Sequence, residues 1–380
     1  MISETKLEEL ARPGAMAPTA ECVRSRPRWL ELREGWNRLA AASAVACPML
    51  SHEWFTLFID NFAPTLPLRV TAVFEGEELT AAAPLAFACR RNLGVPYGVL
   101  QSLSNFHSQR FDLLARDTAS LEALWNQLRS TSGWELLELR DVPDGGQGER
   151  LARLAARDGW LTGRWESMRT PFVPLLEAPA LSAKFRQNLR RRRRHLEEQG
   201  PVRLVECQGG VELDGLLEQG LALEAAGWKG ARGTAIGCDP ATRGFYRELA
   251  HEAARQGWLA LFALYAGDRL AAFHFGLRHG GRYYLPKPAY DEGLGPCSPG
   301  QLLVESVLQR SRELGLSEFD FLGPSMPWKR DWTTLERTHA WHFIYRPNPL
   351  GRALHAWKTE ITPRAKRWSR WALGRMPWKP

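Results

Sequence analysis

One order of elements runs twice along this 380-residue chain, and it constrains the fold more than any other feature. In each half, three β-rich runs are followed by a loop, a helix and one more strand. The runs of the first half are 68–74, 79–88 and 100–114, with a helix at 121–128 and a strand at 134–139; those of the second half are 258–265, 269–278 and 283–290, with a helix at 301–314 and a strand at 318–322. Since the chain is also longer than one domain usually is, we predict two tandem copies of one mixed α/β domain.

Composition shifts and loop residues set the expected domain limits. We predict a flexible N-terminus over residues 1–27, a first domain over 28–177, a second domain over 178–346 and a C-terminal tail over 347–380. The tail is rich in basic residues and tryptophan. A helix over about 182–199 begins the second domain, with Ser182 as its cap.

The net charge of +8 is concentrated in two segments. Residues 184–194 carry seven positive charges and no acid, and residues 350–380 carry a net +7. Because the remaining residues therefore carry −6, the chain is a mildly acidic protein with two basic segments. Five consecutive arginines, Arg190 to Arg194, form the first; they indicate either a solvated helix face or contact with an anionic acceptor, with phosphates of a donor or with nucleic acid.

Several classes of protein are not supported by the sequence. The chain has no apolar run long enough for a membrane span, and its start lacks the pattern of a secretory signal. Six scattered cysteines form no CxxC pair, which argues against a zinc site and a disulfide framework. We therefore expect no metal and a cytoplasmic location.

The most informative stretch is residues 283–323, where a strand enters a Gly/Pro loop and then a helix that begins at Ser298-Pro299-Gly300. Proline suits the first turn of a helix, and Gly300 allows a ligand to approach the backbone. The free N–H groups at a helix start favour an anion such as a phosphate. An ordinary capped helix is the alternative explanation.

Four motifs of the second half resemble those of the GNAT superfamily, in particular the FemAB-like and CelD-like (cellulose-biosynthesis-associated) acetyltransferases. A fifth motif, LQSLSNFH at 100–107, lies in the first half. Those of the second half are LEAAGWKG at 223–230, KPAYDE at 287–292, SPGQLL at 298–303 and FDFLG at 319–323. The resemblance implies two tandem GNAT-like acyl-CoA N-acyltransferase domains, with the reaction centre in the second.

The resemblance also implies where the donor binds. An acyl thioester such as acetyl-CoA would place its pyrophosphate at Ser298, Pro299, Gly300, Gln301 and Leu302, and its acyl arm between two strands that diverge, 283–290 and 318–322. No permanently bound cofactor is implied. The common pyrophosphate signature Q/R-x-x-G-x-G/A is absent, so acyl-CoA, acyl carrier protein and aminoacyl-tRNA all remain possible donors.

Three carboxylates are candidate catalytic groups: Glu224, Asp291 and Asp320. Glu224 is a candidate general base or an ion-pair partner at a helix end. Asp291 is a candidate base or a turn residue. Asp320 lies in an apolar strand, where burial would raise its pKa if it faced the cleft.

Six further residues are candidates for substrate binding: Trp228, Lys229, Lys287, Tyr290, Asn105 and His107. Lys229 suits an anion and Tyr290 suits a leaving thiolate, whereas a lone histidine such as His107 is more often structural than catalytic. His274 alternates with apolar residues, so we expect it to be structural.

The tail shows an apolar stripe at helical spacing, formed by Leu350, Leu354, Trp357, Ile361, Trp368 and Trp371 and interrupted by Pro363. The pattern fits a helix docked on the C-terminal domain, which we favour, or peripheral attachment to an anionic membrane surface. The function expected from the whole sequence is transfer of an acyl group, foremost acetyl, from a CoA thioester to an amine or hydroxyl of an envelope or exopolysaccharide precursor. Aminoacyl transfer from aminoacyl-tRNA and a non-catalytic scaffold in polysaccharide biosynthesis are the alternatives.

Overall fold

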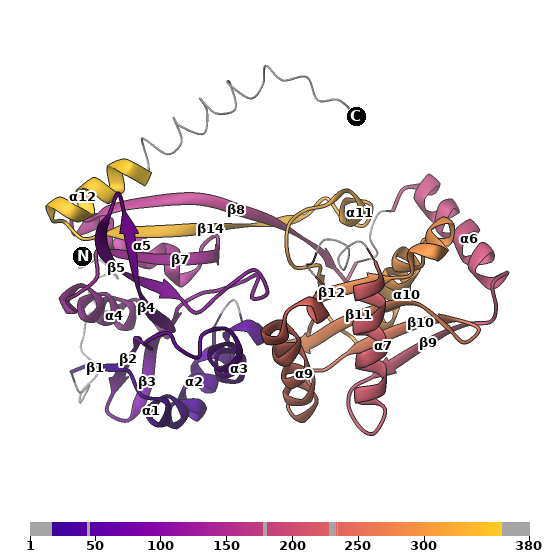
Figure 1. Cartoon of the computed structure of the whole chain (residues 1–380), viewed down its shortest axis with the longest axis horizontal. Helices are drawn as coiled ribbons and strands as arrows, with labels where there is room; N and C mark the ends of the chain where they lie inside the picture. The colour runs from indigo at the N-terminus through magenta and orange to yellow at the C-terminus, as the bar shows by residue number, and fades with distance from the viewer. Residues whose placement is uncertain (1–16, 44–45, 178–180, 228–232, 234, 359–380) are drawn as a thin grey trace, which may run out of the picture.

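The chain forms two α/β domains that lie side by side along its longest axis (Figure 1). This computed structural model describes residues 17–43, 46–177, 181–227, 233 and 235–358. The two-domain fold with large mixed sheets confirms the predicted architecture. Trp228 and Lys229, two of the candidate binding residues, lie outside the described residues.

The described residues of the first domain form one four-stranded sheet, part of the ten-stranded sheet and several helices. Its strands are β1 (Thr19–Val23), β2 (Val70–Glu75), β3 (Glu78–Ala83), β4 (Leu85–Asn92), β5 (Val95–Ser102), β6 (Leu114–Ala115), β7 (Leu136–Pro143) and β8 (Leu161–Pro174). Its helices are α1 (Arg26–Glu31), α2 (Arg33–Ala41), α3 (His52–Phe62), α4 (Thr118–Ser130) and α5 (Gln147–Arg157), with a 3-10 turn η2 (Pro48–Leu50).

The second domain repeats the order in part: three consecutive strands, 261–266, 269–279 and 282–290, lead into its helix 299–313, whereas five strands, β2 to β6, lead into α4. Its strands are β9 (Val202–Cys207), β10 (Leu261–Ala266), β11 (Arg269–His279), β12 (Arg282–Tyr290) and β13 (Glu318–Asp320). Its helices are α6 (Ala183–Glu197), α7 (Leu213–Ala226), α9 (Pro240–Arg255), α10 (Pro299–Glu313) and α11 (Pro327–Arg330), with 3-10 turns η3 (Ile236–Cys238) and η4 (Glu292–Cys297). The hydroxyl of Ser182 accepts from the N–H of Phe185, so it caps α6 as the sequence predicts.

Two long strands join the domains. The ten-stranded sheet has the order β4-β5-β7-β14-β8-β13-β12-β11-β10-β9, and β8 pairs with β14 (Glu336–Tyr345) along most of its length and with β13 at its end. Figure 1 shows β8 and β14 running together from the first domain to the second. The sequence division places residues 336–345 in the second domain, but β14 lies between β7 and β8. The chain therefore returns to the first domain, and the boundary at 346 does not separate two independent units.

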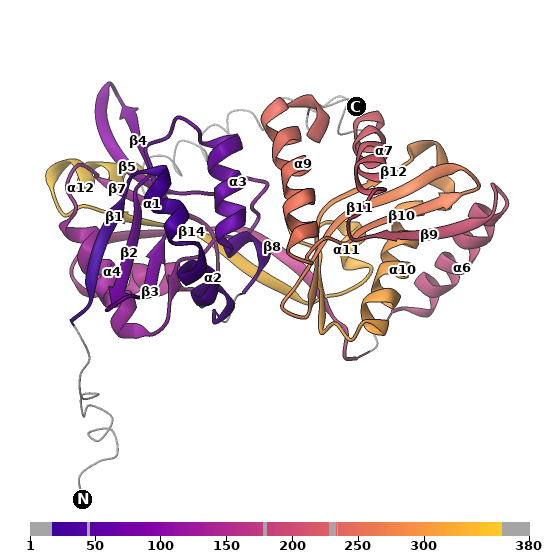
Figure 2. The same cartoon turned by 90° about the horizontal axis from the view of Figure 1, so that it is seen from below.

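The two faces of the second domain's sheet are covered by different helices. In Figure 2, α7 and α9 lie on one face, and α6 and α10 lie on the other. The core on the α6 and α10 face is a separate apolar cluster that contains Phe262, Tyr283 and Leu302. The core on the α7 and α9 face, with Tyr246 and Phe273, is continuous with the core of the first domain. The α7 and α9 face is therefore the one that the first domain closes.

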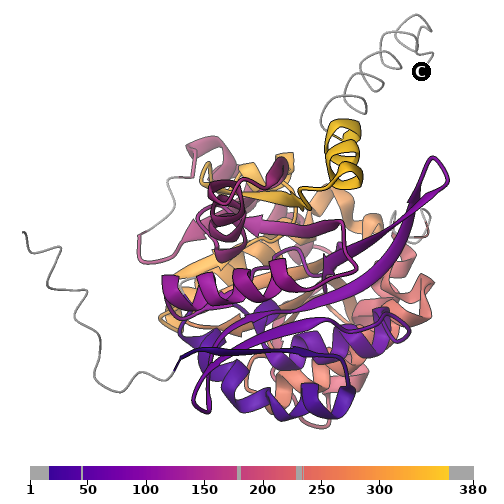
Figure 3. The ribbon, with the colours of Figure 1, turned by 90° about the vertical axis from the view of Figure 1, so that its left-hand side faces the viewer.

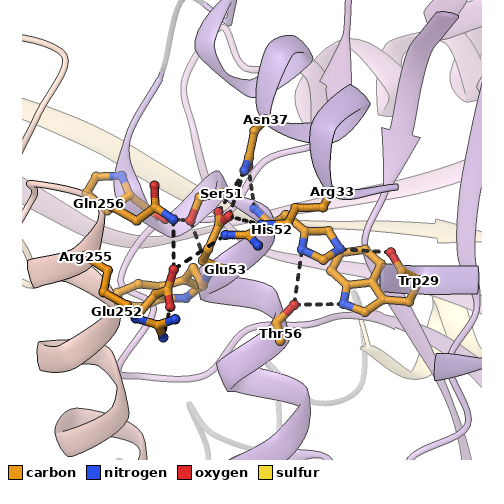
Figure 4. A network of polar contacts seen from close by, with 12 residues as sticks. Trp29, Arg33, Asn37, Ser51, His52, Glu53, Thr56, Glu252, Arg255 and Gln256 are labelled. Atoms are coloured by element: carbon orange, nitrogen blue, oxygen red, sulfur yellow. Dashed lines mark hydrogen bonds and ion pairs between the residues drawn. The ribbon is translucent and has the colours of Figure 1, made fainter. Parts of the chain in front are cut away.

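Helices α3 and α9 form the main helical contact between the domains, through both rings and charges. Trp54 of α3 packs edge-on against Phe245 of α9, with 5.2 Å between ring centres. Figure 4 shows the polar part, where Arg33 donates to the Glu53 carboxylate at 2.8 Å and lies 3.8 Å from Glu252 of α9. Because this interface combines an apolar contact with charges from both domains, it fixes how the domains face each other.

The start of the tail docks on the first domain. Helix α12 (Pro349–Ala356) packs against β14 and β8, and it stands at the top of the first domain in Figure 3. The Lys358 ammonium pairs with the buried Glu138 carboxylate at 3.1 Å. The prediction that the tail docks on the C-terminal domain is therefore wrong for helix α12. Ile361, Trp368 and Trp371 lie outside the described residues. Among the helices that the structure describes, none is long and apolar enough to cross a membrane.

Three buried histidines make the fold sensitive to acid. Burial lowers the pKa of His107, His274 and His339 to about 3, so each stays neutral when folded and takes up a proton when unfolded below pH 6.5. Asp112 opposes this, because burial raises its pKa to about 6 and protonation then favours the folded state. From pH 7.5 to 5.5 we expect the free energy of unfolding to fall by at least about 3 kcal/mol, because burial also lowers the pKa of His52, His279 and His342.

Urea unfolding at the two pH values measures this difference. His274→Leu should remove about 1.4 kcal/mol of the fall, which is the contribution of one buried histidine over this pH range. Equal unfolding free energies at both pH values would contradict the prediction.

Candidate active site

Strand β12 extends beyond the end of its neighbour β13 in the second domain, at the place where the resemblance puts the acyl arm. Their parallel pairing covers only Arg282 to Tyr284 and ends at the pair Tyr284 and Asp320. Strand β12 continues to Tyr290 with β11 as its partner. We call the unpaired edge of β12 at residues 285–290, together with residues 321–323 that follow β13, the gap.

Helix α10 begins beside the end of β12. Ser298 adopts a left-handed conformation (φ 47°), no side chain caps the helix, and Pro299 occupies its first turn. A Cβ added to Gly300 would lie 3.5 Å from the ring of Tyr290, so the exposed Tyr290 ring covers the α carbon of Gly300. Gln301 accepts from the indole N–H of Trp332 at 2.5 Å, which ties the helix start to the segment after α11. Leu302 is fully buried beneath it.

The equivalent helix start of the first domain differs in charge. Helix α4 begins at Thr118, and the Asp117 carboxylate accepts from the N–H of Ser120 at 2.8 Å. A fixed negative charge at a helix start repels an anion and occupies its donors. Of the two equivalent helix starts, α10 is therefore the one suited to a phosphate.

Asp291 has the role of a turn residue. One carboxylate oxygen accepts from the N–H of Gly293 at 2.8 Å, and the other pairs with Arg269 at 2.6 Å. The hydrogen bond from Arg269 lowers the pKa of Asp291. A carboxylate that is held ionised by two donors is a weak base, so we assign Asp291 to shaping the loop before α10.

A polar cluster lies on the opposite face of the sheet, between the domains. His107 of the first domain is within 3.3 Å of both the Tyr246 hydroxyl and the Thr242 hydroxyl of α9. The Lys287 ammonium lies 5.5 Å from the ring centre of Tyr246 and 5.7 Å from that of Phe106. We call Phe106, His107, Glu224, Thr242, Tyr246 and Lys287 the interdomain cluster.

The interdomain cluster brings together sequence motifs that lie far apart. Glu224, 5% exposed at the end of α7, accepts from the N–H of Ile236 at 2.9 Å, and its charge contributes to the raised pKa of the buried Tyr246. Asn105 accepts from the N–H of His107 at 2.9 Å and so holds the turn that presents His107. Burial and the nearby Lys287 keep His107 neutral by lowering its pKa to about 3.

Asp320 lies at the end of β13 in a buried ion-pair group. Its side chain is fully buried, and one carboxylate oxygen lies 2.6 Å from Arg110 and 3.3 Å from Arg337. The other oxygen accepts from the N–H of Leu322 at 2.9 Å. With two guanidinium partners, Asp320 joins the first domain to the second where the gap begins, and this is a structural role.

Arg110, Tyr246 and Lys329 are not among the candidate residues predicted from the sequence. Arg110 stands at the start of an apolar run, where a charge needs a partner, and that is the signal available in the sequence. Lys329 is buried, donates to the carbonyls of Leu322 (2.5 Å) and Pro324 (2.9 Å), and has a pKa lowered to about 8 by burial. Among the described residues, no group of histidine, cysteine, aspartate and glutamate side chains could hold a metal ion.

Comparison with known proteins supports the fold. Residues 183–330 match the family profile described as an acetyltransferase (GNAT) domain. No curated protein sequence matches. The fold is similar to the crystal structure of FemX (TM-score 0.58, 12% identity, covering 89% of this chain and 100% of FemX). It is also similar to the C-terminal domain of a putative lysylphosphatidylglycerol synthetase from Agrobacterium fabrum (TM-score 0.51, 13% identity, covering 86% and 95%).

The family match covers residues 183–330, and it supports an acyltransferase of the GNAT type. More particularly, the two-domain fold of the chain is similar to that of FemX.

Proposed function

We propose that this acyltransferase takes its acyl group, foremost acetyl, from a CoA thioester. The start of α10 carries the proposal: it has no side-chain cap and it lies beside the gap, whereas the equivalent α4 is closed by Asp117. In this proposal the donor's pyrophosphate binds at residues 298–302, and its acyl arm enters the gap from the α10 side. The acceptor then approaches from the interdomain cluster.

The acceptor that we propose is an amine or hydroxyl of an envelope or exopolysaccharide precursor. Glu224 acts as the general base that removes its proton, because it is a buried carboxylate on the acceptor face. Asn105, His107, Lys287 and Tyr290 contact the substrates, together with Trp228 and Lys229. The basic segments suit a cytoplasmic protein that contacts the anionic inner face of a membrane.

Aminoacyl transfer from aminoacyl-tRNA is the second candidate function. Arg190, Arg191 and Arg194 are exposed on α6, which packs beside η4 and α10 at the proposed donor site. One solved structure with a similar fold is the C-terminal domain of a putative lysylphosphatidylglycerol synthetase, a name that refers to a lipid carrying a lysyl group. If this candidate is right, tRNA affinity will be strong and will fall steeply with salt.

A thermal-shift panel separates the two donors. We expect acetyl-CoA or a longer acyl-CoA to raise the melting temperature, because a ligand that binds the folded state stabilises it. CoA release should then follow when an acceptor is added. A shift with aminoacyl-tRNA and none with any acyl-CoA would contradict the proposal.

Gly300→Asp tests the donor site without harming the helix. An acidic residue in the first turn favours the helix dipole but repels a phosphate. We therefore expect an unchanged melting temperature without ligand and at least a tenfold weaker acyl-CoA affinity by calorimetry. Gly300→Ala is the matched control, because its Cβ meets Tyr290 at an ordinary contact distance. Equal affinity of the Asp and Ala variants would place the pyrophosphate elsewhere.

A further inference from the structure

A segment of the first domain, residues 106–110, crosses the gap on the face that this domain closes. At one end, the ring centre of Phe106 lies 5.7 Å from the Lys287 ammonium of β12. At the other end, the guanidinium of Arg110 lies 2.6 Å from the Asp320 carboxylate at the end of β13. Because the segment contacts both strands that border the gap, its intervening residues lie over the gap.

Gln109 places its side-chain amide directly against one of the residues that form the gap. A Cβ added to Gly323 would lie 3.6 Å from each of the Cδ, Oε1 and Nε2 atoms of Gln109. A point at the same distance from all three atoms lies over the flat face of the amide. The amide of Gln109 therefore covers Gly323, and it comes from the other domain.

The amide oxygen of Gln109 has no hydrogen-bond partner. Oε1 is buried, and no described residue donates to it. A buried carbonyl oxygen without a partner costs free energy, so its pairing with a ligand would be favourable. The side chain as a whole is half-buried, and the last torsion of a glutamine side chain is broad, so the amide can turn toward the gap.

The backbone at this contact is strained on both sides. Gln109 (φ 51°) and Leu322 (φ 48°) both adopt the left-handed region that residues other than glycine rarely occupy. Leu322 is held there by its N–H, which donates to Asp320, and by its carbonyl, which accepts from Lys329. Gln109 precedes Arg110, which pairs with the same Asp320. Strain that the surroundings enforce in this way is typical of ligand sites.

A primary amide is complementary to another amide, because it accepts through its oxygen and donates through its nitrogen. The pantetheine arm of an acyl-CoA carries amide groups, and so can an acceptor derived from an envelope precursor. Both substrates would meet at the gap in the proposed reaction. An amide of either one is therefore the chemistry that the Gln109 side chain fits.

We propose that Gln109 is a substrate-binding residue that pairs with an amide group of a substrate in the gap, and this rests on the proposed acyl transfer. Its oxygen accepts from the N–H of the substrate amide, which supplies the partner that no described residue provides. The first domain thus contributes a contact at the reaction centre of the second.

Gln109→Leu removes the amide and keeps a side chain of similar size. We expect an unchanged or higher melting temperature, because an unpaired buried oxygen is replaced by apolar atoms. With acetyl-CoA as donor, the probe acceptors are hydroxylamine, which has no amide, and glycinamide, which has one. Loss of the hydrogen bond should raise one KM about tenfold.

The two probe acceptors distinguish the sources of the amide. A higher KM for acetyl-CoA with both acceptors would identify the pantetheine arm. A higher KM for glycinamide alone would identify the acceptor. If both KM values stay within threefold of those of the natural chain, the proposal is overturned and the amide of Gln109 has only a packing role.

Two further variants control for folding. Gln109→Gly also removes the amide and suits the left-handed backbone, so it should fold at least as well and should show the same rise in KM. Gln101→Leu is the matched control, because Gln101 of β5 accepts from Arg90 at 2.7 Å. It should lower the melting temperature and leave both KM values unchanged. An equal rise in KM in Gln101→Leu would overturn the proposal.

The natural chain separates this proposal from the function on which it rests. If it neither binds nor turns over acetyl-CoA or longer acyl-CoAs, the proposed donor is wrong. If it turns them over and the Gln109 variants behave like the natural chain, only the role of Gln109 is wrong.

Discussion

Replacing Asp320 with asparagine is expected to lower the free energy of unfolding by about 3 kcal/mol, because it leaves the buried cation of Arg110 without its counter-charge. Urea unfolding measures the loss. Asp117→Asn is the matched control: Asp117 also pairs with an arginine, but it is exposed, so we expect a change below about 1 kcal/mol.

The Asp320→Asn variant also separates two roles for Asp320. If Asp320 is only a structural ion-pair partner, activity should fall in step with the folded fraction. If it is a general base, stability should be normal and turnover abolished, and that outcome would contradict the role we assign from the Arg110 and Arg337 contacts.

Glu224→Gln is expected to lower kcat by about 10²- to 10⁴-fold, the range for loss of a general base. The amide keeps the shape of the side chain and an oxygen that can accept from Ile236, so stability should change little. Steady-state rates with acetyl-CoA measure the effect.

Glu252→Gln is the control for Glu224, because Glu252 is also a buried glutamate but lies in the interface between α3 and α9. We expect it to cost stability and to leave kcat within threefold. Equal rates for the natural chain and Glu224→Gln would remove Glu224 from the chemistry.

The local order of elements was predictable from the sequence, because hydrophobic periodicity and caps act over a few residues. The cap at Ser182 and the turn into α10 at Ser298 are examples. The position of β14 was not predictable in this way. Its pairing with β7 and β8 joins residues about 170 to 200 positions apart, and no local pattern encodes such a contact.

In the candidate site, too, the residues that carry local motifs were predictable from the sequence, whereas contacts between distant residues were not. Sequence motifs selected Glu224, Lys287 and His107, and the structure brings these three together between the domains. The sequence motifs could not reveal that Asp320 contacts Arg110, because the two residues are 210 positions apart and each appears in the sequence as an isolated charge. Whether a buried carboxylate acts as a base or has a structural role depends on its hydrogen-bond and ion-pair partners, and the fold determines these partners.

Amide hydrogen exchange of the full chain, with and without acetyl-CoA, tests the central claim most directly. If the donor binds at the start of α10, exchange should slow at Gly300 to Leu302 and in the second half of β12. The first turn of α4, closed by Asp117, serves as the internal reference and should be unchanged. No slowing in α10 with saturating acetyl-CoA, or slowing confined to α4, would contradict an acyl-CoA-dependent transferase with its donor site in the second domain.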